Sequence, residues 1–350
     1  MSVISYKCPN CDGELVFHPG TQKYRCEYCT SAFSQEELNQ MQPETGKEKQ
    51  KNDSSGGTGS QEGSVYSCPS CGAQVVTDET TAASFCYYCH NPVVLSGRVS
   101  GEFMPHKIIP FAIDKEQATE KFLEYVHSKK FVPRAFFKKC QMDKITGVYF
   151  PYWLVDLDLE GTLQAEGKKV REWREDDTEY TETKLYWVER RGDIHLEDIT
   201  RNALTKANNK LSLGVLPYDV RKAQDFHMGY LSGFLAEKRD IEQRDLEISV
   251  RKEAEEYGGK MLRDTVHGYD SLSVKKINLD CRRQNWEYVF LPVWTVTYEG
   301  RDGKVYYYSM NGQNGKVCGE LPVDYKKVFL FSGMIALIVF LLGLAGGYFL

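Results

Sequence analysis

Three features of the sequence predict a multidomain protein. A cysteine pattern occurs twice near the N-terminus, an uncharged apolar stretch lies at the C-terminus, and the region between them mixes helical and strand periodicities. Together they predict two small four-cysteine zinc ribbons, an α+β body with an antiparallel sheet, and one C-terminal transmembrane helix. The predicted segments are residues 1–40 (zinc ribbon 1), 41–64 (flexible linker), 65–97 (zinc ribbon 2), 98–325 (body) and 328–350 (transmembrane helix).

The cysteine pattern consists of two Cys-x-x-Cys pairs separated by fourteen residues, and it repeats sixty positions later. Each pair can clamp one side of a tetrahedral Zn²⁺, and the insert returns the chain to close the other side. Four thiolates leave no open coordination position, so we expect two structural zinc sites and no zinc-assisted hydrolysis. The predicted ligands are Cys8, Cys11, Cys26, Cys29, Cys68, Cys71, Cys86 and Cys89.

Disulfides and buried thiols are the alternatives for these cysteines. Disulfides suit small secreted scaffolds, but residues 1–7 contain no apolar stretch of the length that a secretory signal needs. Tyr6 matches Tyr66, and Tyr28 matches Tyr88, at the same offset of sixty positions. The sequence therefore favours two related zinc ribbons over a disulfide framework.

The stretch from Val328 to Leu350 contains twenty-three residues and no charge. At 1.5 Å per residue, a helix of this length reaches about 34 Å, which is enough to cross a hydrocarbon core of about 30 Å. A buried core helix is the alternative, although globular cores need a shorter apolar run. Lys326 and Lys327 precede the stretch, and positive charge favours the cytoplasmic side. We therefore expect a single-pass, tail-anchored protein of the cell membrane with its N-terminal bulk in the cytoplasm.

Two helices are expected in the body. Asp114 and Gln117 have the spacing of a capping box, and Ala118, Phe122 and Val126 then recur every four residues on one face. A longer helix is predicted from about residue 241, weakened locally by two adjacent glycines at 258 and 259. A stripe of this kind usually faces a core, and it comprises Leu246, Val250, Ala254, Tyr257 and Met261.

Strands account for the rest of the body. We predict that 148–159 pairs with 181–188, and that 288–298, 305–310 and 316–321 form an antiparallel meander. The sequence Asn-Gly-Gln-Asn-Gly at 311–315 supplies turn chemistry for its last connection.

One short internal match lies within these strands. Residues 147–153 (Gly-Val-Tyr-Phe-Pro-Tyr-Trp) resemble residues 288–294 (Tyr-Val-Phe-Leu-Pro-Val-Trp) at an offset of 141. Duplicated β-rich half-domains would explain the match, and coincidence is the alternative because the match is short.

The sequence contains no catalytic constellation, so we expect a protein that is not an enzyme. It has no P-loop, no H-E-x-x-H, no G-x-S-x-G, and no G-x-G-x-x-G after a predicted strand. The charged residues of 1–40 sum to −2 and those of 64–100 sum to −1. Nucleic-acid binding relies on Lys and Arg, so this balance disfavours it. A nucleic-acid-associated zinc-ribbon protein of replication or transcription remains the alternative function.

The tandem ribbons, the segments 80–89, 147–153 and 311–316, and the C-terminal span resemble one bacterial family. It is the YdjG-like family of double-zinc-ribbon membrane proteins of Firmicutes, whose members are often labelled TFIIB-type zinc-ribbon or primosomal helicase-like proteins. The resemblance covers nearly the whole chain and implies that the eight cysteines are zinc ligands. It transfers no catalytic residue. It also implies a protein partner of the SPFH (flotillin-like) class, which the family helps to hold at the membrane.

The helicase label conflicts with the sequence, which lacks a nucleotide-binding loop. We therefore expect a membrane-anchored cytoplasmic adaptor or scaffold that recruits or holds a protein partner at the membrane, with the ribbons reaching for it on their linker. The GxxxG spacing of Gly343 and Gly347 within the span allows a homo-oligomer.

Overall fold

The computed structural model describes residues 3–4, 6–41, 64–67, 74–77, 80–85, 92–95, 98–133, 145–205, 213–299 and 305–349. Contacts divide the chain into two compact units. The first unit comprises Met1–Pro151, Leu204–Lys238 and Phe290–Leu350, and the second comprises Tyr152–Ala203 and Arg239–Val289. The domain boundaries predicted from the sequence remain a prediction.

The described residues of the first unit form short strands and the helices α1, α2 and α6. Its N-terminal strands are β1 (Val3–Ile4), β2 (Leu15–His18), β3 (Lys23–Cys26), β4 (Ala32–Phe33), β5 (Ser64–Ser67), β6 (Gln74–Thr77), β7 (Thr81–Phe85) and β8 (Pro92–Leu95). Its later strands are β9 (Lys107–Ile108), β12 (Gln224–Asp225), β13 (Leu235–Glu237), β15 (Val305–Asn311) and β16 (Val317–Gly319). Its helices are α1 (Gln35–Met41), α2 (Lys115–His127) and α6 (Tyr325–Phe349), with 3-10 turns at Gly101–Phe103, Val220–Lys222 and Met228–Leu231.

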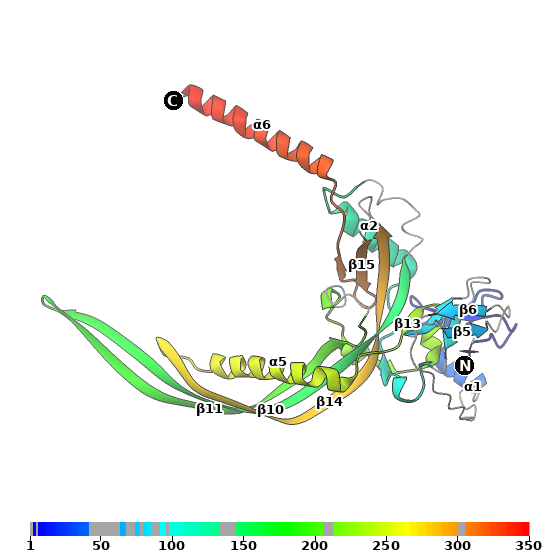
Figure 1. Ribbon diagram of the computed structural model, residues 1–350, viewed down its shortest axis with the longest axis horizontal. Coiled ribbons are helices and arrows are strands. Elements are labelled where there is room, and N and C mark those ends of the chain that lie inside the picture. The colour runs from blue at the N-terminus through cyan, green and yellow to red at the C-terminus, as the bar shows by residue number, and fades with distance from the viewer. Residues whose placement is uncertain are drawn as a thin grey trace. The chain divides into compact units, whose positions relative to one another are not determined.

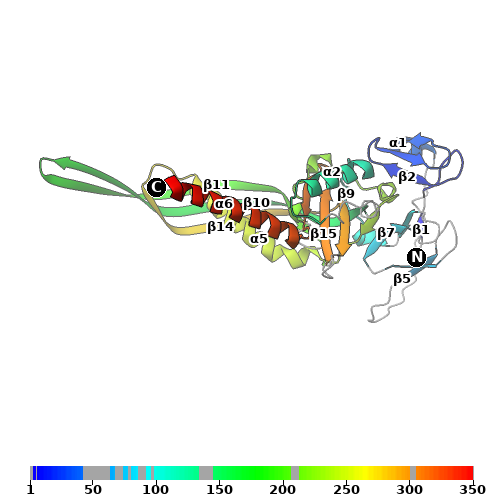
Figure 2. The same cartoon turned by 90° about the horizontal axis from the view of Figure 1, so that it is seen from above.

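Three very long strands and one helix build the second unit. They are β10 (Thr146–Glu175), β11 (Thr178–Asn202), β14 (Ser271–Glu299) and α5 (Gln243–Asp264). The first residues of β10 and the last residues of β14 belong to the first unit. In the second unit the three strands form a curved ribbon, and α5 lies along its concave side (Figure 1). Seen from above, β10 lies between β11 and β14 (Figure 2).

Hydrogen bonds join most strands of the described residues into one sheet, in the order β1-β8-β7-β13-β10-β14-β15-β16, with β11 paired to β10. The predicted antiparallel meander is confirmed, because β14 pairs with β15 and β15 pairs with β16. β10 also pairs with β11, but the predicted partners were wrong: residues 152–159 pair with 194–202, and residues 181–188 pair with 165–172. β10 and β13 pair in parallel, with Val148 opposite Leu235 and Tyr149 opposite Ala236. A strand as short as β13 leaves too little periodicity to be recognised in a sequence.

The two copies of the internal match have the same structural role. Trp153 in β10 donates its indole N–H to the carbonyl of Ile241, at 3.0 Å. Trp294 in β14 does the same to the carbonyl of Ile113, also at 3.0 Å. Each acceptor stands directly before the N-cap residue of a helix, α5 in the first case and α2 in the second. Each tryptophan therefore fixes the point where a helix begins.

Helix α2 follows its prediction closely. The Asp114 side chain accepts the N–H of Gln117, and the Gln117 side chain accepts the N–H of Asp114, which completes the capping box. Ala118, Phe122 and Val126 are all buried. The Phe122 ring packs edge-on against Tyr308 of β15, with ring centroids 4.7 Å apart.

Helix α5 departs from its predicted apolar stripe. Val250, Ala254, Gly258, Gly259 and Leu262 are buried, whereas Tyr257 and Met261 of the predicted stripe are 57% and 40% exposed. The prediction assumed that glycine weakens the helix, but Gly258 is a contact point: a Cβ there would lie 3.2 Å from Ile194 and 3.4 Å from Leu159. The helix approaches the sheet closely at its two glycines. The face of the helix that packs on the sheet therefore includes Leu262 and excludes Met261.

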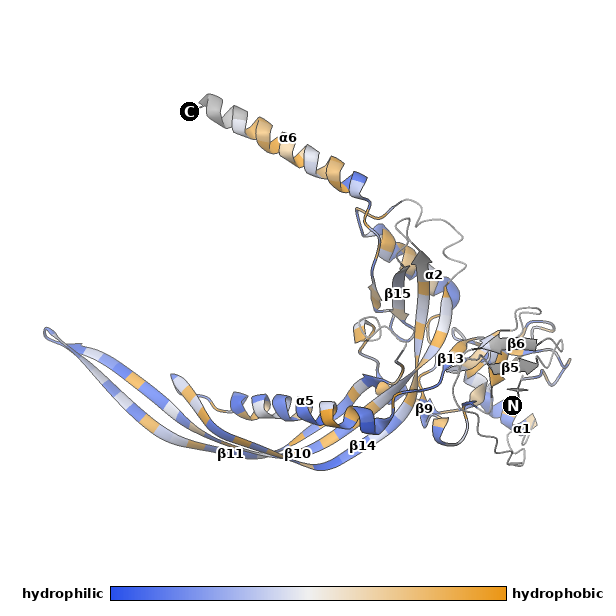
Figure 3. Ribbon diagram, viewed as in Figure 1, coloured by the Kyte–Doolittle hydropathy of each residue, from blue (hydrophilic) through white to orange (hydrophobic). Residues whose placement is uncertain are grey.

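The strands are also longer than the hydrophobic pattern indicates. In β10, buried and partly exposed residues alternate as far as Gly167, and beyond it most residues are exposed. The hydrogen-bonded ladder with β11 nevertheless continues to the pair Glu175 and Thr178. Figure 3 shows mixed polar and apolar residues along this outer part of the hairpin. The prediction ended the first strand at residue 159 and kept only residues 181–188 of the second, so it missed residues 160–175 of β10 and 189–202 of β11.

Replacing Leu262 with alanine tests this helix packing. The Leu262 side chain is 5% exposed, and its Cδ1 would meet a Cβ placed on Gly161 at 2.6 Å. We expect L262A to lower the free energy of unfolding of the second unit by about 2–5 kcal/mol, as for other buried leucines. The matched control, M261A, should change it by less than about 0.5 kcal/mol because Met261 is exposed. Thermal and denaturant unfolding of the detergent-solubilised chain measures both; equal losses would contradict the packing described here.

Candidate functional site

Four cysteine sulfur atoms gather at one end of the β2–β3 hairpin. Those of Cys8, Cys11, Cys26 and Cys29 all lie within 4.8 Å of one another. The Sγ atoms of Cys8 and Cys29 are 3.6 Å apart, and those of Cys11 and Cys26 are 3.5 Å apart. Cys8 and Cys26 are buried, whereas Cys11 is exposed. The first predicted ligand set is therefore brought together.

The local backbone explains how each Cys-x-x-Cys pair presents its sulfurs. The carbonyl of Cys8 accepts the N–H of Asp12, and the carbonyl of Cys26 accepts the N–H of Thr30. Asp12 and Thr30 both adopt φ of 60°, so the chain turns sharply after the second cysteine of each pair. A left-handed conformation is costly for a β-branched residue such as Thr30. Two equivalent tight turns thus face each other across the group.

The spacing of the sulfur atoms fits a tetrahedral metal ion. With Zn–S bonds of about 2.3 Å, the sulfurs of a tetrahedral site lie about 3.8 Å apart. The two closest pairs here are slightly shorter than this distance, and every sulfur is within 4.8 Å of the others. An all-thiolate donor set is typical of structural zinc. The group could therefore hold a metal ion such as zinc.

Neighbouring groups shift the pKa values of two of the four thiols, Cys29 and Cys11, in opposite directions. The side chain and backbone of Ser31 lower the pKa of Cys29 to about 6, so its thiolate predominates at neutral pH. At Cys11 the Gly13 backbone lowers the pKa, but the neighbouring sulfurs of Cys29 and Cys26 outweigh it and raise the pKa to about 12. A cation bound among the sulfurs would favour all four thiolates, and binding would release protons.

The second predicted ligand set, Cys68, Cys71, Cys86 and Cys89, lies outside the described residues. The strands that flank it in the sequence are described. β5 pairs with β6, and β7 pairs with β8 in the large sheet. The second metal site remains a prediction.

The first ribbon packs against a segment that sequence reasoning did not connect with it. The N–H of Phe17 donates to the carbonyl of Ser232 at 3.1 Å, and the Ser232 hydroxyl donates to the carbonyl of Leu15 at 2.5 Å. The rings of Phe17 and Tyr230 meet edge-on, with centroids 5.2 Å apart. We refer to these contacts as the ribbon seam. These contacts hold the ribbon against the rest of its unit, and the expectation that the ribbons reach a protein partner on their linker stays a prediction.

The ribbon seam also contains polar side chains. Buried Tyr24 donates its hydroxyl to Gln35, and the side-chain nitrogen of Gln35 lies 3.3 Å from Nε2 of His227. Burial lowers the pKa of His227, whose Nδ1 accepts the N–H of Gly229 at 3.1 Å. No short motif marks these partners, because they lie about two hundred positions apart in the chain.

Helix α6 is long and apolar enough to cross a membrane. The stretch Tyr325–Gly343 has a mean hydropathy of 2.0, and none of it is buried. Figure 3 shows apolar residues on the described part of this helix, after a polar first turn. The Asp324 carboxylate accepts the N–H groups of Lys326 and Lys327, which caps the start of the helix.

The outer β10–β11 hairpin carries large apolar side chains in the open. The rings of Trp173 and Tyr180 stack at 5.5 Å, and both are about two-fifths exposed. Leu185 and Trp187 of β11 are each 63% exposed. They are two residues apart and therefore project from one face of the strand. Trp173 and Tyr180 pair directly and project from the opposite face, because Tyr180 lies five positions before Leu185. We refer to Leu185 and Trp187 as the hairpin patch. Exposed apolar side chains that lie next to each other can mark an interaction surface.

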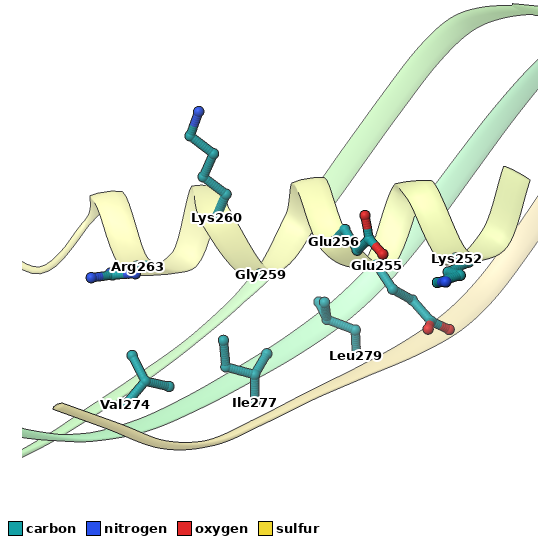
Figure 4. Close-up of a pocket in the computed structure, with 9 residues that line it drawn as sticks. All are labelled: Lys252, Glu255, Glu256, Gly259, Lys260, Arg263, Val274, Ile277 and Leu279. Carbon is teal, nitrogen blue, oxygen red and sulfur yellow. The ribbon is translucent and has the colours of Figure 1, made fainter.

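A groove of about 620 Å³ lies between α5 and the start of β14. Val274, Ile277 and Leu279 form its floor and point toward the helix (Figure 4). Lys252, Glu255, Glu256, Lys260 and Arg263 line its helical side. An apolar floor with a rim of both charges suits an apolar segment of another molecule.

Substitution of one cysteine tests the metal group. We expect C26S to reduce the bound zinc by one ion per chain, measured by mass spectrometry of the metal. It should also speed amide hydrogen exchange at Phe17 and Ser232, because loss of the metal loosens the hairpin that holds the ribbon seam. C281S is the matched control, since Cys281 lies outside the group, and it should change neither quantity. Metal loss without faster exchange would show that the ribbon seam is independent of the metal.

Comparison with known proteins finds no matching family model and no matching solved structure. It does find a relative in Bacillus subtilis (strain 168), described as the uncharacterized protein YdjG. The two chains are 30% identical over 350 residues, which cover 99% of this chain and 96% of the relative. A match of this extent runs from the four-cysteine group through both units to α6. The chain therefore belongs to the YdjG family.

Proposed function

We propose that this chain is a membrane-anchored adaptor that holds a protein partner at the membrane, with its bulk in the cytoplasm. The observation that carries the proposal is α6, in which no residue of the apolar stretch Tyr325–Gly343 is buried. An apolar helix that the fold leaves largely uncovered needs an apolar environment, and a lipid bilayer supplies one. Lys326 and Lys327 at its start favour the cytoplasmic side for the preceding chain.

Structural zinc completes the proposal. The four-cysteine group would hold Zn²⁺ through Cys8, Cys11, Cys26 and Cys29, and the second set would hold another ion. A closed site of four thiolates stabilises a fold and does not activate water. The metal would therefore keep the β2–β3 hairpin in the conformation that the ribbon seam requires.

The hairpin patch is the surface we propose for the partner. Tryptophan is among the residues that dominate the binding energy of protein interfaces, and the patch exposes Trp187 on a long, regular hairpin. The family resemblance points to a partner of the SPFH (flotillin-like) class. Confinement of both proteins to one membrane raises their effective concentration, so even a weak contact would suffice.

Nucleic acid is the second candidate partner of this hairpin. Arg171 lies over the Trp173 ring at 5.6 Å, and Lys169 lies over the Tyr186 ring at 5.8 Å, an arrangement found in single-strand binding surfaces. Residues 166–190, however, contain six basic and eight acidic side chains, a net charge of −2. This balance opposes phosphate binding and favours a protein partner.

Truncation separates anchoring from binding. A chain that ends at Lys327 should still bind its partner but leave it in the cytosol, because only α6 is removed. Fluorescence microscopy of the tagged partner in cells measures its location, and co-purification measures the complex. If the partner stays at the membrane in cells with the truncated chain, this chain does not recruit it.

A single substitution tests the hairpin patch. We expect W187S to weaken partner binding by at least tenfold, since burying a hot-spot tryptophan contributes about 2 kcal/mol or more. The control is I248S on α5, which also removes an exposed apolar side chain, 82% exposed, and should leave binding unchanged. Titration of the purified partner by calorimetry compares them. Equal effects of the two substitutions would rule out the patch, and salt-sensitive binding of single-stranded DNA would favour the nucleic-acid candidate.

A further inference from the structure

The body of the protein makes direct contact with the first two turns of α6. The N–H of Asp324 donates to the carbonyl of Phe131 at 2.7 Å, and Nζ of Lys327 donates to the carbonyl of Val132 at 2.7 Å. The rings of Phe131 and Phe331 pack edge-on with centroids 5.5 Å apart. The segment that follows α2 therefore lies against α6 beyond Lys327, the last charged residue of that helix.

These contacts bring two lysine pairs together. Lys129 and Lys130 follow α2, whereas Lys326 and Lys327 open α6. Nζ of Lys130 lies 5.8 Å from the centroid of the Phe331 ring, on α6 itself. Across residues 128–133 and 322–328 there are four lysines and one acidic residue, Asp324, a net charge of +3. The Asp324 carboxylate is engaged by the helix start.

The depth of these groups follows from helix geometry. Phe331 stands four residues after Lys327, which corresponds to about 6 Å along the helix axis. The headgroup layer of a bilayer is about 5–7 Å thick on each side. A spanning α6 that places Phe331 at the edge of the hydrocarbon core places Lys327 in the headgroup layer. Because Phe131 contacts Phe331, it reaches the same edge, and Lys129 and Lys130 lie in the headgroup layer beside it.

We propose that Lys129, Lys130, Lys326 and Lys327 form a lysine collar that binds the headgroups of anionic phospholipids around α6. The inference rests on the proposed function, since it requires that α6 spans the membrane. It adds a lipid preference and gives the segment after α2 a role that its sequence does not reveal. Each lysine near an anionic surface strengthens binding about fivefold.

Lipid retention by the full-length chain tests the collar. The chain is reconstituted in vesicles of phosphatidylcholine and phosphatidylglycerol, and native mass spectrometry after gentle extraction counts the lipids that stay bound. We expect phosphatidylglycerol to be retained in preference to phosphatidylcholine. K129Q/K130Q should reduce the retained phosphatidylglycerol by roughly tenfold or more, because two of the four charges are removed.

The control substitutes another adjacent lysine pair. Lys168 and Lys169 are exposed and belong to the second unit, so K168Q/K169Q should leave lipid retention unchanged. An unchanged zinc content and circular dichroism spectrum would show that both variants are folded. If K129Q/K130Q retains as much phosphatidylglycerol as the unmodified chain, or if the control loses as much as K129Q/K130Q, the collar is wrong.

Two further measurements separate the possible failures. Inorganic phosphate should not displace the retained lipid; displacement would identify a soluble-anion site and overturn the lipid assignment. Extraction of the vesicles with alkaline carbonate should leave the chain embedded. A chain that is washed out lacks a membrane span, which overturns the proposed function together with the collar. A chain that stays embedded without preferring phosphatidylglycerol overturns the collar alone.

Discussion

The pairing of β10 with β14 is the constraint on which the rest of the molecule depends, because these two strands contribute to both units. The short aromatic motif lies at the start of β10 and near the end of β14, and most residues there are buried, including Tyr149 and Phe290 at 0% exposure. A buried strand segment of this kind tolerates little change in register, since a shift of one residue would exchange its two faces. The tryptophan at the end of each motif then determines where α2 or α5 starts. A short sequence, used twice, thereby sets two helix positions.

Large apolar side chains become exposed where this burial ends. Inside the sheet, large side chains are buried against one another. On the outer hairpin, Trp187 and Leu185 are each 63% exposed. The same contrast holds at α6, where most apolar residues of the stretch up to Gly343 are exposed. The four-cysteine group differs from both, because two of its four cysteines, Cys8 and Cys26, are buried. The four-cysteine group, the exposed hairpin residues and α6 thus lie on separate elements of the fold.

The sequence predicted those features that depend on neighbouring residues. The capping box of α2, the first four-cysteine group and the apolar length of α6 are each encoded within a few turns of chain, and the structure shows all three. The ribbon seam could not be predicted, because Phe17 and Ser232 are brought together only by the completed fold. The face of α5 was misjudged for a related reason. Glycine at 258 is unfavourable in an isolated helix but permits close packing on a sheet, and only the tertiary partners, Ile194 and Leu159, decide between the two.

The ribbon seam has a consequence for how the protein is made. The carbonyl of Leu15 cannot accept its hydrogen bond from the hydroxyl of Ser232 until Ser232, 217 residues later in the chain, has been synthesised. At about 5–20 residues per second, the β2–β3 hairpin emerges tens of seconds before its docking surface exists. Aromatic residues such as Phe17 and Tyr24, buried at the end, are solvent-exposed during that interval. A metal ion bound early would hold the nascent hairpin in shape without its partner, so metal supply would govern the yield of folded protein during translation itself.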